Sequence, residues 1–258
     1  MRDILAEIVE KKREIVAAAK RELPLTEMRP QLQTDHFRMA RRVRKGEWSL
    51  IAECKLRSPA KGDLCRRFSV DQLAEFYEAN GAAMLSVHTD PHFLGKNEDL
   101  QRIAQRTALP VLRKDFIIDA YQIYEARYLG AAAVLLIVRI LSSQQLAEYL
   151  ALTAELGMDA LVEVHDRDDM ERAMSVPSRF LGINNRNLTS FTTSIGNTLD
   201  LLPYADASRV LISESGVHTQ LEARRLQQAG CDGILVGEGL AVADDIAGQT
   251  AAFARPEK

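Results

Sequence analysis

Two opposite charges stand two residues apart in the stretch SLIAECKLRSPAKG, which covers residues 49–62. Glu53 and Lys55 follow apolar, strand-forming residues, and side chains at positions i and i+2 of a strand point to the same face. Charges on a buried face cost desolvation energy unless they are paired or take part in function. The segment alone therefore allows two interpretations, a structural ion pair or the floor of an active site.

Charged or amide side chains also end the later strand-like segments. They are Lys114 in PVLRKD, Glu163 in ALVEVHD, Asn184 and Arg186 in FLGINNRN, Glu214, Ser215 and Gly216 in VLISESG, and Gly237 and Glu238 in VGEG. Groups of mixed sign that gather in a cleft are candidates for perturbed pKa values and for catalysis. The repetition favours the active-site interpretation.

These side chains restrict the chemistry. Two lysines and two glutamates can supply an acid, a base and anchors for an anionic substrate. Lys114 follows Arg113 directly, so strand alternation sends one inward and one outward, and lysine is the more usual proton donor because arginine stays charged. Arg186 with Asn184 could bind a substrate carboxylate. A Schiff base on Lys55 or Lys114 remains open.

Two glycine-containing turns indicate a phosphate site. Ser215-Gly216 follows the seventh strand-like segment and Gly237-Glu238 the eighth, where barrels often bind phosphate through backbone N–H groups. The histidines are scattered, and no His/Cys/Asp cluster has metal-ligand spacing. We therefore expect no metal, and we expect the histidines to be structural or solvent-facing.

The elements that position these groups alternate from residue 48 onward. Several strand-like segments are almost continuously apolar, as is typical of strands covered on both faces. This pattern predicts an α/β fold, a TIM (β/α)8 barrel; the alternative, an open doubly wound sheet, lacks a G-x-G-x-x-G after its first strand. The predicted strands lie at 48–54, 83–88, 110–114, 132–138, 159–164, 179–184, 209–213 and 232–236. The predicted helices lie at about 70–80, 97–106, 119–129, 142–156, 167–175, 197–203, 218–229 and 243–254.

The first 45 residues are predicted to be a helical extension on a barrel at 46–258, all within a single domain 1–258. An amphipathic helix is expected over 3–22 and a second over about 33–44, which includes His36. The basic residues of the second helix are either a solvated face or a cap near an anionic substrate. They are Arg38, Arg41, Arg42, Arg44 and Lys45.

Composition excludes several classes of protein. The 258 residues are 47% hydrophobic and 27% charged, with a net charge of −3, which is ordinary for a globular enzyme and argues against a nucleic-acid partner. Cys54, Cys65 and Cys231 are expected to be free thiols in a reducing compartment. No apolar run approaches the ~20 residues of a membrane span, so we expect a cytoplasmic protein without a membrane partner, with a monomer as the simplest assembly.

Six motifs, in order, resemble the indole-3-glycerol phosphate synthase family of tryptophan biosynthesis, over about residues 4–250. They are IAECK-x-x-SPAKG, VLRKDFI, LVEVHD, GINNRNL, ISESG and VGEGL. The resemblance implies a lyase, a decarboxylase that closes the ring of 1-(o-carboxyphenylamino)-1-deoxyribulose 5-phosphate with loss of carbon dioxide and water. It implies a small phosphorylated substrate and no metal or organic cofactor.

The resemblance also implies roles. Lys114 corresponds to the general acid that protonates the ribulose carbonyl, and Glu163 to the group that handles the later dehydration. Lys55 corresponds to the lysine that contacts the substrate carboxylate, and Glu53 would hold the lysine pair in place. Asn184, the last implied catalytic residue, would lie beside the anthranilate moiety. The implied substrate-binding residues are Arg186, Ser58, Phe93, Ser215, Gly216, Gly237 and Glu238.

The sequence departs from the family pattern in two places. In the loop 88–96, His88 replaces a leucine and Lys96 stands where serine is usual, and Gly239 replaces a serine of the last motif. The altered loop leaves open a non-catalytic paralogue that binds a phosphorylated ligand. Another phosphate-binding barrel, such as phosphoribosylanthranilate isomerase, would need a cysteine and an aspartate, but Cys54 should face the helices and the sixth strand offers Asn184. The loop 56–68 is expected to close as a lid.

Overall fold

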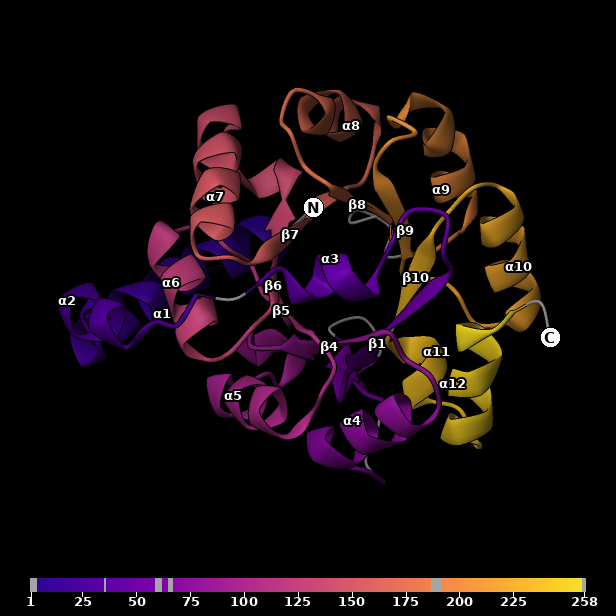
Figure 1. Ribbon diagram of the computed structural model, residues 1–258, viewed down its shortest axis with the longest axis horizontal. Helices are drawn as coiled ribbons and strands as arrows, with labels where there is room; N and C mark the ends of the chain where they lie inside the picture. Colours follow the sequence, from indigo (N-terminus) through magenta and orange to yellow (C-terminus); the bar gives the residue numbers. More distant parts are fainter. Residues whose placement is uncertain (1–3, 35, 59–61, 65–66, 187–191, 257–258) are drawn as a thin grey trace.

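The computed structural model describes residues 4–34, 36–58, 62–64, 67–186 and 192–256. Its centre is a closed barrel of parallel strands in the order β1-β10-β9-β8-β7-β6-β5-β4, ringed by helices (Figure 1). The strands are β1 (Ser49–Cys54), β4 (Met84–His88), β5 (Val111–Lys114), β6 (Ala133–Ile137), β7 (Asp159–Val164), β8 (Phe180–Asn184), β9 (Val210–Glu214) and β10 (Gly233–Val236). The predicted TIM barrel is therefore confirmed, and the open sheet is excluded.

The helices of the ring follow the strands in turn. They are α4 (Val70–Ala79), α5 (Asn97–Arg106), α6 (Ala120–Tyr128), α7 (Ser143–Glu155), α8 (Arg167–Met174), α9 (Gly196–Leu201), α10 (Gln220–Gln228), α11 (Glu238–Ala241) and α12 (Ile246–Ala254). Reciprocal capping boxes fix where four of them begin, at Ser69, Asp119, Ser142 and Thr219. Each cap satisfies two backbone N–H groups that would otherwise lack a partner.

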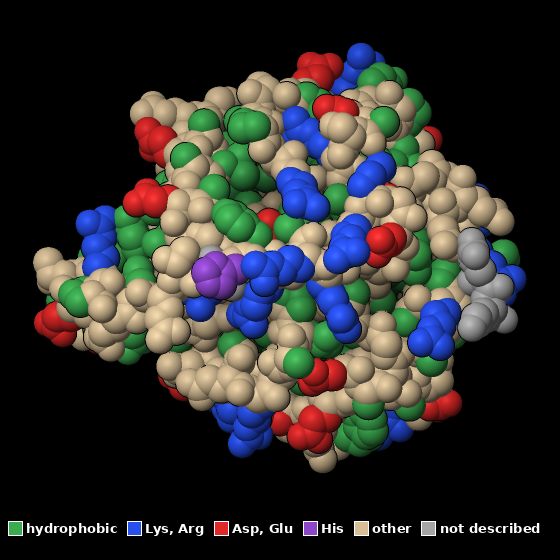
Figure 2. Space-filling model, viewed as in Figure 1, with side chains coloured by type: hydrophobic (Ala, Val, Ile, Leu, Met, Phe, Trp, Pro, Cys, Tyr) green, Lys and Arg blue, Asp and Glu red, His purple; other side chains and the backbone are tan. Residues whose placement is uncertain are grey.

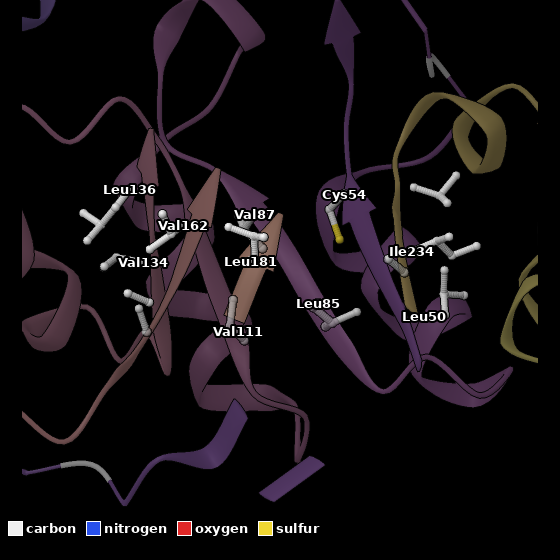
Figure 3. Packing of buried hydrophobic residues seen from close by; sticks show 14 of the residues in the cluster. Leu50, Cys54, Leu85, Val87, Val111, Val134, Leu136, Val162, Leu181 and Ile234 are labelled. Carbon is white, nitrogen blue, oxygen red and sulfur yellow. The ribbon is translucent and has the colours of Figure 1, made fainter. Parts of the chain in front are cut away.

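The barrel strands bury both faces, which gives the core two apolar layers. The outer layer packs the strands against the helices and includes Leu50, Cys54, Leu85 and Val87 (Figure 3). Cys54 thus points away from the barrel axis, as strand alternation predicts. Cys54 and Cys231 are buried free thiols, and burial raises the pKa of both; Cys65 lies outside the described residues.

The N-terminal segment lies partly against the ring of helices and partly across one end of the barrel: its first two helices pack on α6, and its last helix covers the end. It comprises α1 (Ile4–Glu22), α2 (Leu25–Met28), the 3-10 helix η1 (Arg29–Gln31) and α3 (Arg38–Arg42). Apolar side chains of α3 pack with the inner layer of the barrel, and α3 crosses the ring in Figure 1. The backbone N–H of Ala40 donates to Asp159 at the start of β7 (3.0 Å), so α3 lies at the N-terminal ends of the strands.

Two expectations for this segment are wrong. The second helix is shorter than predicted because Phe37 adopts a left-handed φ of 53°, and His36 precedes the helix instead of belonging to it. The basic residues gather on the face at the N-terminal end of the barrel (Figure 2), opposite to the strand ends that carry the polar groups. They form a solvated face, and the alternative of a cap near the substrate is ruled out.

Within the described ranges, no helix combines the length and apolar character that crossing a membrane requires.

The division of the chain at residue 45 and the single-domain interpretation stay predictions.

Candidate active site

One pocket opens at the C-terminal ends of the barrel strands. It brings together almost all of the side chains singled out from the sequence: Glu53, Lys55, Phe93, Lys114, Glu163, Asn184, Arg186, Ser215, Gly216, Gly237 and Glu238. Glu214 is fully buried and is not among the described residues that line the pocket. Ser58 belongs to β2 (Arg57–Ser58), which pairs with β3 (Gly62–Asp63) in a small antiparallel hairpin, and its side chain lies outside the described part of the structure.

Lys114 occupies the centre of the pocket between two carboxylates. Its Nζ donates hydrogen bonds to Oε2 of Glu163 (2.9 Å) and to Oε2 of Glu214 (2.6 Å). The three residues come from β5, β7 and β9, and inward-pointing side chains of alternate strands share a layer in such barrels. Distant segments of the chain therefore meet at one ammonium group.

Glu214 is fully buried and contacts Lys114, and no role was predicted for it from the sequence. An available signal was Gly182 in β8, because a Cβ at this position would lie 1.9 Å from Oε1 of Glu214. The glycine leaves room for the neighbouring carboxylate. Gly237 does the same for Glu53, whose Oε1 would lie 2.3 Å from an added Cβ. Two glycines thus shape the space that two glutamates occupy.

The cluster around Lys114 separates the pKa values of its two acids. Burial disfavours the charge of Lys114, but the two carboxylates outweigh it and raise the pKa of this lysine. Burial, with added repulsion from Glu163, raises the pKa of Glu214 to about 8. Burial acts on Glu163 too, but Lys114 and His165 hold the pKa of Glu163 below its ordinary value. One carboxyl is therefore an acid and the other a base near neutral pH.

Glu53 forms a second charged group at the rim of the barrel. Its Oε1 lies 3.3 Å from Nζ of Lys55 and 3.2 Å from Nε2 of His88. Burial would raise the pKa of Glu53, but Lys55, His88 and Lys114 together hold it well below its ordinary value. Glu53 thus contacts Lys55 directly and acts on Lys114 through space.

Three histidines line the pocket. His218 is exposed at its edge, as expected, whereas His88 and His165 are buried beside charged pocket residues, a placement that was not predicted. His88 is 7% exposed and stacks on Phe93, with ring centroids 4.4 Å apart. His165 places Nε2 3.3 Å from Oε1 of Glu163 and Nδ1 3.5 Å from Asp169. The available signal for His165 was its position two residues after Glu163 on the same strand face.

A buried ionic network supports the pocket from outside the barrel. Arg113 points away from the pocket, as alternation predicts, and its Nη2 donates to Glu125 (2.6 Å). Lys12 of α1 places Nζ 2.5 Å from Asp115 and 2.8 Å from Asp90. Asp115 follows Lys114, and Asp90 begins the turn that carries Phe93, so α1 is anchored to two pocket segments at once.

The turns after β8, β9 and β10 form the opposite wall. Ser215 and Gly216 both have left-handed backbones, with φ of 64° and 73°, and Ser215 stores strain of the kind found at functional sites. The backbone N–H of Arg186 donates to Oδ1 of Asn184 (3.0 Å), and Nη2 of Arg186 lies 3.8 Å from Glu238. This wall presents backbone N–H groups and one guanidinium, which suits an anionic ligand.

Close packing explains why residue 239 is a glycine in this chain and not the serine of the family pattern. A Cβ at this position would lie 2.4 Å from the carbonyl oxygen of Val217, so a serine would require the two turns to separate. Among the described residues, no three His, Cys, Asp or Glu side chains come together as a metal site requires. Of the proposed lid, residues 59–61 and 65–66 lie outside the described part, and its closure stays a prediction.

Comparisons with known proteins agree on one family. The family model described as indole-3-glycerol phosphate synthase matches residues 5–253. Proteins named indole-3-glycerol phosphate synthase from Carboxydothermus hydrogenoformans and from Polaromonas sp. are each 43% identical to this chain over 252 residues, covering 93% and 95% of it and 96% of each relative.

Solved structures share the fold at low identity. A 3-hexulose-6-phosphate synthase from Salmonella typhimurium superposes with a TM-score of 0.66 at 13% identity, over 81% of this chain and 97% of its own. An orotidine 5'-phosphate decarboxylase from Pyrococcus horikoshii OT3 gives 0.61 at 12% identity, over 80% and 98%. These structures support the barrel, whereas the family model and the sequence relatives decide the family. The chain belongs to the indole-3-glycerol phosphate synthase family.

Proposed function

We propose that this chain converts 1-(o-carboxyphenylamino)-1-deoxyribulose 5-phosphate into indole-3-glycerol phosphate, with loss of carbon dioxide and water, in tryptophan biosynthesis. The observation that carries the proposal is the protonated Lys114 held between Glu163 and Glu214 at the pocket centre. The proposed reaction proceeds by proton transfer and by charge neutralisation, both supplied by side chains.

Ring closure begins at Lys114. Its ammonium group donates a proton to the ketone oxygen of the ribulose chain, which makes that carbon electrophilic. The aromatic carbon that bears the carboxylate attacks it, so a carbon–carbon bond forms and the carbonyl oxygen becomes a hydroxyl. Carbon dioxide then leaves and the ring regains its aromaticity. Glu214, which holds a proton near neutral pH and lies 2.6 Å from Lys114, can return a proton to the lysine.

Dehydration completes the indole. Glu163, kept ionised by Lys114 and His165, removes a proton from the carbon next to the nitrogen. The hydroxyl leaves as water after Lys55 protonates it, and the double bond of the five-membered ring forms. Glu53 keeps Lys55 in place for this step and for binding the substrate carboxylate.

Substrate orientation follows from the two walls of the pocket. Phe93 would pack against the aromatic ring, while Asn184 and Arg186 would hold the anthranilate end. We assign the phosphate to the turns that contain Ser58, Ser215, Gly216, Gly237 and Glu238. The carboxylate of Glu238 would repel a phosphate, so its contribution is its backbone N–H group, with its side chain turned to Arg186.

The test is turnover by the purified chain, followed as indole fluorescence after addition of the carboxyphenylamino-deoxyribulose phosphate. Turnover supports the proposal; a folded protein that binds the substrate without forming product would favour the non-catalytic paralogue. The isomerase alternative is weakened by Cys54, which packs in the outer layer away from the pocket. A cytoplasmic location, a monomeric state and independence from metals, cofactors and nucleic acids stay predictions.

A further inference from the structure

His88 is a buried pocket residue that contacts both an aromatic ring and a carboxylate. It ends β4, and in the strand register it stands opposite Lys114 of β5. The imidazole is almost parallel to the ring of Phe93, at an interplanar angle of 7°. Its Nε2 lies 3.2 Å from Oε1 of Glu53, a charge contact that is not a hydrogen bond in this structure.

The turn that carries Phe93 is folded tightly back on His88. It contains the 3-10 helix η2 (Pro91–Phe93), which Asp90 precedes. The backbone carbonyl oxygen of Asp90 accepts hydrogen bonds from the N–H groups of Phe93 and Gly95 (3.1 and 3.0 Å). A Cβ on Gly95 would lie 2.5 Å from the backbone of His88. The backbone therefore brings the Phe93 ring to the imidazole, and the stack fixes its tilt.

The carboxylate that His88 approaches is also the one that holds Lys55. Oε1 of Glu53 is shared between the imidazole and the ammonium group, and Nζ of Lys55 lies 5.3 Å from the centroid of Phe93. Four side chains thus form a closed set in which each contacts two others. A leucine in place of His88 could pack on the ring but could not contact the carboxylate.

We propose that His88 is a positioning residue for the reaction, joining Phe93, the platform for the aromatic ring of the substrate, to Glu53, which orients Lys55. The inference rests on the proposed function for its kinetic consequences. Its two contacts act on different quantities. The stack on Phe93 determines how tightly the aromatic ring of the substrate binds, and so it affects KM. The contact with Glu53 determines where Lys55 lies during the reaction, and so it affects kcat.

Three variants separate the two contacts. His88→Phe keeps a flat ring on Phe93 and removes the nitrogen, so kcat should fall about tenfold while KM stays within about twofold. His88→Gln keeps a polar group beside Glu53 and removes the ring, so KM should rise about two- to tenfold with a smaller change in kcat. His88→Leu removes both features and should change both constants. Circular dichroism and thermal melting establish that each variant is folded.

A second measurement does not depend on turnover. The titration of the Glu53 carboxyl, followed by 13C NMR, should move to higher pH in His88→Phe and His88→Leu, because His88 is one of the groups that lower the pKa of Glu53. Lys55 and Lys114, the other two such groups, are unchanged in these variants.

The outcomes distinguish this inference from the proposed function. If the wild-type chain turns over and all three variants keep its kcat and KM, the inference is wrong and the function stands. If the wild-type chain does not turn over, the function fails, and the inference then depends on the titration: an unchanged Glu53 pKa in His88→Phe overturns it, and a raised pKa supports the coupling of His88 to Glu53.

Discussion

Replacing Lys12 by methionine tests how far the N-terminal helix supports the pocket. Lys12 is 2% exposed, and its Nζ contacts Asp90 and Asp115, which are 0% and 1% exposed in their side chains. Methionine keeps the length and the apolar stem of lysine and removes the charge. The variant leaves two buried carboxylates without their shared cation.

The size of the expected loss of stability depends on which polar partners each carboxylate retains in the variant. Asp115 still contacts Arg113 (3.3 Å) and accepts from Thr89 (2.6 Å), so most of the cost falls on Asp90, whose Oδ2 loses the ammonium group at 2.8 Å. Removing one partner of a buried ion pair costs about 3–5 kcal/mol. For a chain of this size the melting temperature should fall by about 6–20 °C.

The assay is urea unfolding at pH 7 and pH 4, followed by circular dichroism and by the fluorescence of Trp48, with Lys11→Met as the control. Lys11 is 59% exposed in its side chain and pairs with Glu14 three residues away, so its loss should cost less than about 0.5 kcal/mol.

The pH dependence of the Lys12→Met effect has a definite sign. Burial would raise the pKa of Asp115, but Lys12 and Arg113 lower it below 3.8. The stability that this pair contributes is thus present above the unfolded pKa and lost as pH falls through the folded one. Without Lys12 the buried carboxyl of Asp115 takes up a proton at higher pH, so the difference between variant and wild type should shrink at pH 4. A loss below 1 kcal/mol at pH 7, or an equal loss in the Lys11 control, would show that Lys12 does not stabilise the two buried carboxylates.

Four further substitutions probe the central cluster. Lys114→Ala or Glu163→Gln should lower kcat by at least ~10²-fold in a protein that circular dichroism shows to be folded; a rate near wild type in either would refute its assigned role. In the wild type, kcat/KM should fall as pH rises through about 8, because ionised Glu214 binds the ammonium of Lys114 more tightly and makes it a weaker acid. Glu214→Gln should lose this alkaline limb in a pH profile, and a limb that persists would assign it to another group. Gly182→Ala should lower kcat about 10–100-fold by displacing the Glu214 carboxylate; kinetics at wild-type level would show that the carboxylate has room to move.

Much of the fold could be predicted from the sequence because local patterns determine it. The continuous apolar runs and the alternation of strand and helix place all eight barrel strands within one residue of their observed ends. The helix at 33–44 was too long because the left-handed backbone of Phe37 is set by how α3 packs into the end of the barrel. Tertiary packing outweighs helical propensity in a segment this short.

The site could be predicted less completely, because local sequence patterns do not determine which side chains of different strands contact each other. That Lys114 points inward follows from alternation, but its pairing with Glu214 depends on β5 and β9 being two strands of one closed barrel. The approach of His88 to Glu53 depends on how β1 and β4 are staggered. Lys12 reads as one lysine among several on an amphipathic helix, and its burial appears only when α1 packs beside the pocket.

The strand ends should form a single pocket in which one phosphorylated substrate lies in one orientation. A crystal structure with indole-3-glycerol phosphate bound would show this orientation. We expect the phosphate at the turns of Ser215, Gly216 and Gly237, and the indole ring beside Phe93 within reach of Lys114. A product bound outside this pocket, or with its phosphate at Phe93, would rule out the proposed orientation.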